Sequence, residues 1–412
     1  GLFDTIIEWD KEGKLKPAYV KSNGYRYYSE ESILAYTQER KTKKNLNVIG
    51  YARVSSEKQL DDLERQVDNI KEYYKDVPIV IEFPAKETKL YDKLEKSKIE
   101  EYVKGQLEQL DWLKEVDPDV QFIGVGGSFR SLSKISRKIK KYPLDMVHNY
   151  QLSRADFYNI YDMIKVLDLD KKMKIKGMST ARADVFPCAL SVIKAFVDHM
   201  DYQVITTSGC GLREGYMFNY AIPQTLEKPI SDILGHSLNT YSNYLGLDTT
   251  HSEQVFNLCI QLFRQLRVLH KFPRAYVRVL RVAALMHESG KCFKFFNYQK
   301  HSSYMILHSN LYGIAHKDLV LAAFVSDMFN KDEINMADWV KYKDLLTEED
   351  VEAGKKLAVM LKLAVALDRS RSAVITEINC DVLGDSVIMK TETDGNDNTL
   401  EFKEAMAVAG DF

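Results

Sequence analysis

The chain has 412 residues, of which 45% are hydrophobic and 28% charged, as in a folded protein of about two to four domains. Its formal net charge of −2 gives no global electrostatic case for nucleic-acid binding. The five cysteines are scattered, which favours reduced thiols over a disulfide framework or a zinc site. No apolar run approaches the roughly 20 residues of a membrane span. We therefore expect a cytoplasmic protein with no membrane partner.

The first part of the chain combines helical and strand signals. Residues 1–44 predict a short helix, a turn and a second helix, ending in the basic segment Arg40–Lys44. Residues 46–54 are rich in β-branched and aromatic side chains and predict a strand, which an amphipathic helix follows. The first methionine is Met146. We expect that an initial element of a domain precedes Gly1, with a processed or trimmed end as the alternative.

The middle of the chain alternates between strand and helix patterns. Residues 79–84 predict a strand, and an apolar stripe between 99 and 113 predicts a helix. Residues 122–128 predict a strand that ends in a glycine turn. Helices and short strands, such as 203–206, continue the pattern to about residue 221, which is typical of an α/β fold.

The last part of the chain changes character twice. Residues 250–371 predict an all-helical region with long apolar faces. Residues 374–379 and 386–391 predict strands, and Asp394–Asp397 is typical of a hairpin turn. The expected fold class is therefore multidomain, α/β plus all-α, with a small C-terminal α+β piece.

Two motifs near the start resemble a serine recombinase of the resolvase type. They are Gly50–Ser56 followed by Asp62–Gln66, and the preceding Trp9–Tyr28 resembles a MerR-like winged helix. In that family the serine matching Ser55 attacks a DNA phosphate, and the arginine matching Arg53 stabilises the phosphoryl charge.

The recombinase resemblance is expected to end near Tyr74, before the family's further active-site arginines. We therefore expect Arg53 and Ser55 to be inactive. Weak DNA contact is one interpretation of the basic residues here, and a solvated basic face is the other. These residues are Lys14, Lys16, Lys21, Arg26 and Arg40–Lys44.

From about Phe83 to its end the chain resembles the Ppx/GppA phosphatases through several motifs in the family's order. The motifs are Phe83–Pro84 with Thr88–Leu90, Ile123–Ile135, Tyr142–Leu144 with His148, Met178–Asp184 and Ser208–Gly215. The resemblance implies an actin-like ATPase (ribonuclease H-like) architecture and possible homodimers. It also implies removal of terminal phosphate from polyphosphate or guanosine pentaphosphate, with Mg²⁺ and a glutamate that activates water. The family's first lobe, which carries that glutamate, has no counterpart here, so the catalytic residues are unknown.

Two groups of residues are candidates for binding phosphate chains. Gly126, Gly127 and Ser128 form a turn between strand and helix whose backbone N–H groups suit an anion, and Arg130 adds a guanidinium. The alternative is a tight turn that serves packing only. A polyanion channel is the second candidate, against a solvated helix end. Its residues are Lys291, Lys294, Lys300, His301 and His308.

The helical region resembles an HD-type domain. His251, His287, Glu288 and Asp368 fall at the places of its metal ligands, where His, His-Asp and Asp are usual. The His-Glu pair moves one carboxylate outward by a methylene, so a degenerate site is expected, with metal binding as the alternative.

We expect the chain to contain five parts. They are a MerR-like fragment (1–44), a truncated recombinase piece (45–75), the second phosphatase lobe (76–225), an HD-like helical domain (226–372) and a small β-rich domain (373–412). The predicted function is that of the exopolyphosphatase and guanosine pentaphosphate phosphohydrolase family, with competence open. A non-catalytic polyphosphate- or nucleotide-binding module and a DNA-binding recombinase remnant are the alternatives.

Overall fold

Two compact units make up the chain in the computed structural model, residues 1–95 and 96–412, and each is described by itself. The described residues are Arg65, the strands β1 to β4, and 96–411 without 118–119, 222–229, 331–335 and 385.

The first unit contains two pairs of short strands. β1 (Tyr19–Val20) is antiparallel to β2 (Arg26–Tyr27), within a region that predicted helices and a turn. β3 (Ile49–Arg53) and β4 (Ile79–Phe83) confirm two predicted strands and pair in parallel. We expected a domain boundary at residue 75, and this parallel pair links one strand from each side of that boundary. The expected helices of this unit lie outside the described residues.

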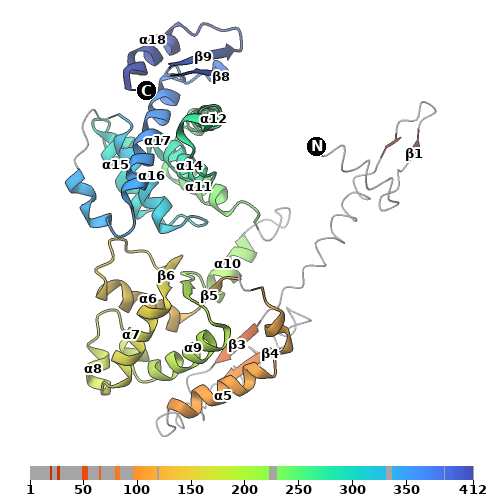
Figure 1. Ribbon diagram of the computed structural model, residues 1–412, viewed down its shortest axis with the longest axis vertical. Helices are drawn as coiled ribbons and strands as arrows, with labels where there is room; N and C mark the ends of the chain where they lie inside the picture. The colour runs from red at the N-terminus through yellow and green to blue at the C-terminus, as the bar shows by residue number, and fades with distance from the viewer. Residues whose placement is uncertain are drawn as a thin grey trace. The chain divides into compact units, whose positions relative to one another are not determined.

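The second unit begins with a small three-stranded sheet and the helices beside it (Figure 1). The strand order is β5-β7-β6, with β5 parallel to β7 and β6 antiparallel to it. The elements are α5 (Lys96–Glu108), η2 (Asp111–Glu115), β5 (Phe122–Gly124), α6 (Gly127–Ile139), β6 (Tyr150–Ser153), α7 (Arg154–Lys165), α8 (Leu169–Met173), η3 (Thr180–Arg182), α9 (Phe186–Met200), β7 (Val204–Thr207) and α10 (Leu212–Ala221).

One apolar core holds the sheet to its helices. Leu132 and Ile135 of α6 pack against Leu152 of β6 and Ile205 of β7, and Phe157 of α7 is completely buried with them. Two buried hydroxyl pairs add specificity, because Ser133 lies 2.5 Å from Thr207 and Ser136 lies 2.9 Å from Tyr150. This arrangement confirms the predicted α/β region.

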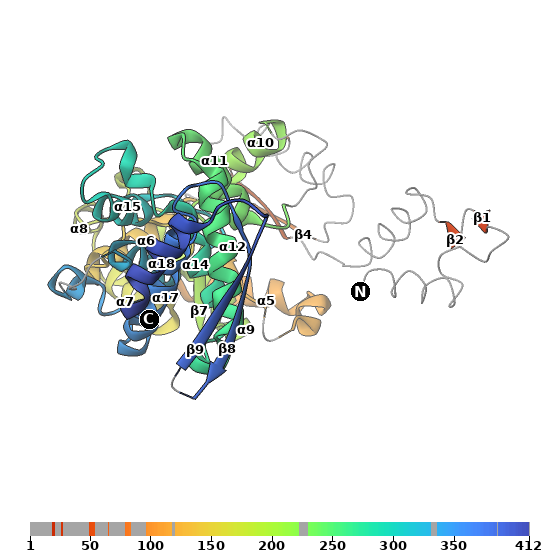
Figure 2. The ribbon, with the colours of Figure 1, turned by 90° about the horizontal axis from the view of Figure 1, so that it is seen from above.

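A helical region follows, as predicted, and contains the larger core. α12, α14 and α17 pack on one another, and α14 and α17 also contact α16 (Figure 2). The elements are α11 (Ile233–Leu245), α12 (Thr249–Gln265), α13 (Arg267–His270), α14 (Tyr276–Met286), η4 (Ser289–Cys292), α15 (Tyr298–His308), α16 (His316–Met328), η5 (Met336–Tyr342) and α17 (Glu348–Ala366). The part boundary expected at 225 falls outside the described residues.

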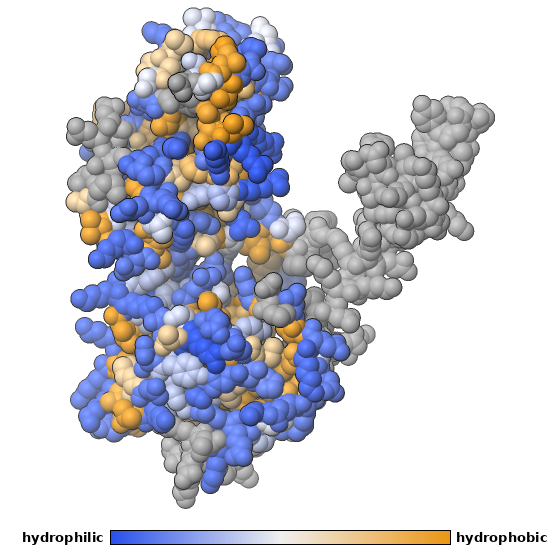
Figure 3. Space-filling model, viewed as in Figure 1, coloured by the Kyte–Doolittle hydropathy of each residue, from blue (hydrophilic) through white to orange (hydrophobic). Residues whose placement is uncertain are grey.

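The C-terminal elements belong to the same core. β8 (Ile375–Leu383) and β9 (Ser386–Thr393) form an antiparallel hairpin, and α18 (Thr399–Val408) and η6 (Ala409–Asp411) follow. Ile375 and Ile378 are completely buried in the helical core, so the tail packs on that core. An apolar stripe lies over the hairpin in Figure 3.

The hairpin turn expected at Asp394–Asp397 is wrong. The chain reverses direction between Leu383 and Ser386, where Gly384 has a positive φ of 60°. Asp394–Asp397 instead leads into α18, and the Asp397 carboxylate accepts a hydrogen bond from the Thr399 N–H at 3.0 Å. Asx residues bond nearby backbone in both settings, so the sequence signal did not distinguish them.

A buried histidine joins the α/β and helical regions. His316, at the start of α16, lies 2.9 Å from the Tyr142 hydroxyl through Nδ1. Its Nε2 lies 2.8 Å from the His148 carbonyl, which can only accept a hydrogen bond. The Asn149 side chain also donates to the Ile314 carbonyl at 2.8 Å. Burial lowers the pKa of His316 and so favours the neutral imidazole at this junction. None of the described helices is long and apolar enough to cross a bilayer.

The larger core predicts a strong difference between two leucine truncations. Leu258 is fully buried between helices, whereas Leu212 is 85% exposed. We expect Leu258→Ala to lower the free energy of unfolding by about 2–5 kcal/mol, and Leu212→Ala by less than about 0.5 kcal/mol. Urea titration followed by tryptophan fluorescence reports on this core through the buried Trp339. Equal losses for both variants would contradict the assigned core.

The junction histidine predicts a pH dependence of stability. Because the folded pKa of His316 lies below that of the unfolded chain, the unfolded state binds more protons once the pH falls below about 6.5. Stability should therefore decrease as pH falls from 7 towards 5, and His316→Gln should show a shallower decrease. The matched control is His236→Gln at an exposed position, which should keep the wild-type slope. Identical slopes for wild type and His316→Gln would disprove the assignment.

Candidate functional site

The sheet topology gathers two loops at one edge. β5 and β7 run parallel, and Gly124 pairs with Thr207 at their carboxyl ends. The loops that leave these strands therefore start side by side, and the Ser208 N–H donates to the Gly124 carbonyl at 2.9 Å. The carboxyl edge of a parallel pair is where α/β folds bind ligands. This edge is the first candidate site.

The first loop is the glycine turn that opens α6. Gly126 has φ 109° and ψ −178°, a conformation that a side chain would strain. No side chain caps the helix at this position. The N–H groups of Gly127 and Ser128 therefore begin a 13-residue helix with its positive dipole end open to a ligand. The structure brings the predicted phosphate-binding residues together here.

Two guanidinium groups flank this turn. Arg182 of η3 lies so close that a Cβ added at Gly127 would overlap with its guanidinium. Arg130, one turn into α6, donates from Nη1 to the Gly209 carbonyl at 3.1 Å. A guanidinium carries five N–H donors, so this bond leaves donors for an anion. Arg182 belongs to the Met178–Asp184 motif, and its part in the site was missed because only the fold places it beside Gly127.

The second loop follows β7 at this edge, and its Gly209 lies close to His148. The Gly209 N–H donates to His148 Nδ1 at 3.2 Å, and a Cβ on Gly209 would lie 2.8 Å from the His148 Cβ. The Glu214 carboxylate accepts from the Gly211 N–H at 2.7 Å and caps α10. Backbone hydrogen bonds with Gly211 and within Glu214 lower the pKa of this carboxyl. The edge therefore combines helix dipole, amides and two arginines with one structural carboxylate.

The second candidate site lies in the helical region and gathers predicted ligands from separate elements. His251 of α12 and His287 with Glu288 at the end of α14 offer ligand atoms that all lie within 4.8 Å of one another. His251 Nε2 and His287 Nε2 each lie 3.8 Å from Glu288 Oε1. Among the described residues this is the group that could hold a metal ion.

Hydrogen bonds fix both imidazole rings. His287 Nδ1 lies 2.7 Å from the Ala284 carbonyl, so this nitrogen carries the proton and Nε2 keeps its lone pair. That Nε2 is buried without a hydrogen-bond partner. His251 Nδ1 lies 2.7 Å from Asp368 Oδ2, and the other carboxylate oxygen accepts from the Ala373 N–H at 2.9 Å. Asp368 therefore orients His251 and leaves its Nε2 facing Glu288.

Two cations already neutralise Glu288. Arg371 Nη2 lies 2.6 and 2.7 Å from its two carboxylate oxygens, and the Lys291 ammonium also pairs with it. Burial would raise the pKa of the Glu288 carboxyl, but His287 and these two cations outweigh that effect and lower the pKa to about 2. Burial lowers the pKa of His287 to about 4, so this imidazole is neutral near pH 7.

Arg371 is the functional residue that the sequence did not reveal at this site. It lies 83 residues from Glu288 in the chain and has a left-handed backbone, with φ 62°. Its Nη1 also lies 3.1 Å from the Asp248 carboxylate, which caps α12 through the His251 N–H. Its position three residues after Asp368 was the available signal.

The structure does not bring the five residues of the expected polyanion channel onto one line. Lys291 is committed to Glu288, with its ammonium 4.7 Å from the Tyr298 ring centre. His308 stacks on Tyr304 at the opposite end of α15 from Lys300. The channel therefore stays a prediction for Lys294, Lys300 and His301.

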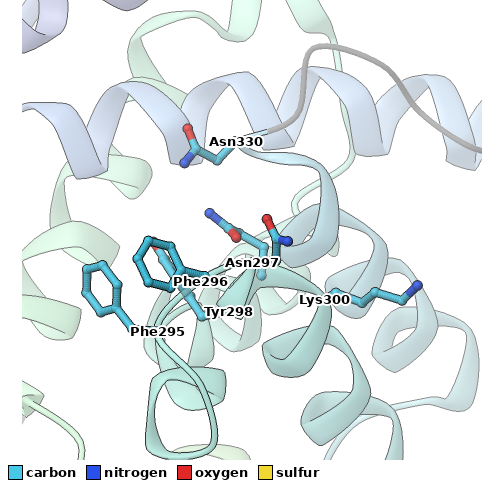
Figure 4. A pocket seen from close by; sticks show the side chains of 7 residues that line it. Phe295, Phe296, Asn297, Tyr298, Lys300 and Asn330 are labelled. Carbon is cyan, nitrogen blue, oxygen red and sulfur yellow. The ribbon is translucent and has the colours of Figure 1, made fainter.

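A surface pocket of about 480 Å³ lies at the start of α15 (Figure 4). Phe295 and Phe296 form one side and Asn330 another, while the Lys300 ammonium points away from the pocket. Phe293 is exposed beside it and packs edge-on against His301 at 4.9 Å. The pocket thus presents aromatic surface, and its lysine faces solvent.

The remaining expected residues do not form a described site. Arg53 ends β3, and Ser55 lies outside the described residues. For Mg²⁺, which prefers oxygen ligands, the edge around α6 offers Glu214, whose carboxylate is engaged by Gly211. These residues fit a phosphate anion better than a protein-held Mg²⁺.

Two models of one family match most of the chain. Residues 86–222 match the Ppx/GppA phosphatase family, and residues 235–406 match its domain III. The N-terminal domain of resolvases matches residues 48–112. That match runs past Tyr74, where we expected it to end, and overlaps the phosphatase match. The phosphatase matches do not favour a DNA-binding remnant or a non-catalytic module.

Curated relatives of this chain are named guanosine-5'-triphosphate,3'-diphosphate pyrophosphatases. The guanosine-5'-triphosphate,3'-diphosphate pyrophosphatase of Vibrio vulnificus (strain YJ016) is 23% identical over 278 residues, which are 67% of this chain and 52% of that protein. The enzyme of the same name from Aeromonas hydrophila is 26% identical over 49% of this chain and 39% of its own. The chain spans about half the length of such relatives or less.

Solved structures of the family match at low similarity. An Aquifex aeolicus Ppx/GppA family member has a TM-score of 0.31 at 14% identity, over 48% of this chain and 84% of its own. An exopolyphosphatase from Cytophaga hutchinsonii has a TM-score of 0.32 at 14% identity, over 51% and 88%. The sequence matches, and the ordered motifs at the α6 edge, show that the chain belongs to the Ppx/GppA phosphatase family.

Proposed function

We propose that this chain supplies the phosphate-gripping part of a phosphohydrolase that removes terminal phosphate from guanosine pentaphosphate or polyphosphate. The observation that carries the proposal is the uncapped start of α6 between two arginines. A helix N-terminus with free N–H groups and flanking guanidinium groups binds phosphate oxygens through charge-assisted hydrogen bonds.

The geometry at this edge suits a chain of phosphates. The N–H groups of Gly127 and Ser128 are placed for one phosphoryl group, and Arg182 and Arg130 approach from two elements. Neutralising charge on the phosphoryl oxygens is the largest protein contribution to phosphoanhydride cleavage. We place this region in an actin-like lobe and residues 226–372 in an HD-like domain.

Hydrolysis needs two further components. A general base has to orient the attacking water, and we propose that another chain supplies it. Mg²⁺ would be held through the phosphate oxygens of the substrate, since the α6 edge lacks a free set of carboxylates. A homodimer stays a prediction of the family resemblance.

The proposal predicts which arginines control substrate binding. We expect Arg182→Gln and Arg130→Gln each to weaken binding of guanosine pentaphosphate or a short polyphosphate by about tenfold or more, the size of one lost charge-assisted contact. Isothermal titration calorimetry at low salt measures this. Arg267→Gln, at an exposed arginine on α13, is the matched control and should keep wild-type affinity.

The binding measurement and a phosphate-release assay test the two parts of the proposal separately. Tight binding without phosphate release supports both parts of the proposal. Phosphate release by the purified chain would contradict the external base, and an Arg182→Gln variant with unchanged affinity would contradict the α6 site.

A further inference from the structure

The His251–His287–Glu288 cluster contains a buried nitrogen whose environment phosphate binding at α6 does not explain. His287 is completely buried, yet its Nε2 accepts no hydrogen bond. A buried polar atom without a partner destabilises the folded state. Its lone pair faces the same small space as His251 Nε2 and Glu288 Oε1. Two imidazole nitrogens and a carboxylate oxygen gathered in this way can bind a metal ion.

We propose that His251 Nε2, His287 Nε2 and Glu288 Oε1 bind one transition-metal ion, and that Arg371 and Lys291 set its affinity by competing for the Glu288 carboxylate. Two imidazoles and one carboxylate form a ligand set that suits Zn²⁺, Co²⁺ or Ni²⁺ and disfavours Mg²⁺. The proposal is independent of phosphate binding at α6.

The distances allow an ion with small movements. Ligand atoms about 2.1 Å from a tetrahedral ion lie about 3.4 Å apart. Both imidazole nitrogens lie 3.8 Å from Glu288 Oε1, and all three atoms lie within 4.8 Å of one another. A closure of about 1.4 Å or less therefore forms the site, and Glu288 is the half-buried member that can move.

Neighbouring groups prepare the ligands. Asp368 accepts from His251 Nδ1 at 2.7 Å, and the Ala284 carbonyl lies 2.7 Å from His287 Nδ1. Each ring therefore presents an unprotonated Nε2, as metal-binding imidazoles do when a carboxylate or carbonyl holds the other nitrogen. Asp368 is a positioning residue here, because both of its oxygens are already engaged.

Arg371 gives the site a built-in competitor. Its guanidinium and the Lys291 ammonium supply the positive charge that Glu288 would otherwise receive from the ion. Arg371 is partly exposed, so its side chain can release Glu288 without disturbing a core. A bound ion would link α12 to the end of α14 and stabilise the folded chain by mass action.

The test is Co²⁺ and Zn²⁺ titration of the metal-free full chain, followed by calorimetry, by the visible absorption of Co²⁺ and by the melting temperature. We expect Arg371→Asn, which keeps a residue that tolerates positive φ, to bind about tenfold more tightly than wild type. The matched control is Arg369→Asn, an adjacent arginine that pairs with Glu404 at 3.5 Å, and it should bind as wild type does.

Further variants separate the site from adventitious binding. Glu288→Gln and His251→Ala should abolish the Co²⁺ spectrum, and Asp368→Asn should weaken binding by about 10- to 100-fold, as loss of an orienting partner does. Circular dichroism confirms that each variant is folded, and Glu288→Gln, at a partly exposed position, keeps the test valid if a histidine variant does not fold. Equal Co²⁺ affinity in wild type and Glu288→Gln, or no binding by Arg371→Asn, would overturn the proposal.

Discussion

An uncapped helix N-terminus is the constraint around which the second unit is arranged. Gly126 turns the chain with a positive φ, and α6 then begins with no side chain bonded to its first N–H groups. The pairing of β5 with β7 places the 208–211 loop beside this turn, and Arg130 ties the two together through the Gly209 carbonyl. Donors of this kind can bind an anion. The proposed phosphate-binding role rests on this arrangement.

The helical region is subject to a different constraint, which is the burial of carboxyl groups. Asp368 is almost completely buried, and it is stable there because it accepts from His251 and from the Ala373 N–H. Glu288 is satisfied by Arg371 and Lys291 in the same way. Only His287 Nε2 lacks a partner in this cluster as described. The two regions therefore differ in their chemistry, since the start of α6 offers N–H and guanidinium donors and the helical cluster offers imidazole and carboxylate acceptors.

Sequence pattern predicted the elements well where a local rule applied, as at the strand and glycine turn of 122–128 and along the helices from 250 to 371. The resemblance to an HD-type domain also predicted that His251, His287 and Glu288 lie together. Sequence pattern failed where the outcome depended on distant contacts. Arg371 reaches Glu288 across 83 residues, and Lys291 is drawn into that pair instead of facing a ligand. The hairpin was misplaced because Asp and Asn bond nearby backbone in turns and before helices alike.

Hydrogen–deuterium exchange of the backbone amides is the most direct test of the account's central claim, that α6 begins in a phosphate site. Tripolyphosphate or guanosine pentaphosphate should slow exchange at the amides of Gly127, Ser128 and Phe129, because phosphate oxygens would accept their hydrogen bonds. The aromatic segment 293–300 should exchange at an unchanged rate. Protection confined to 293–300, with no change at the start of α6, would contradict the account.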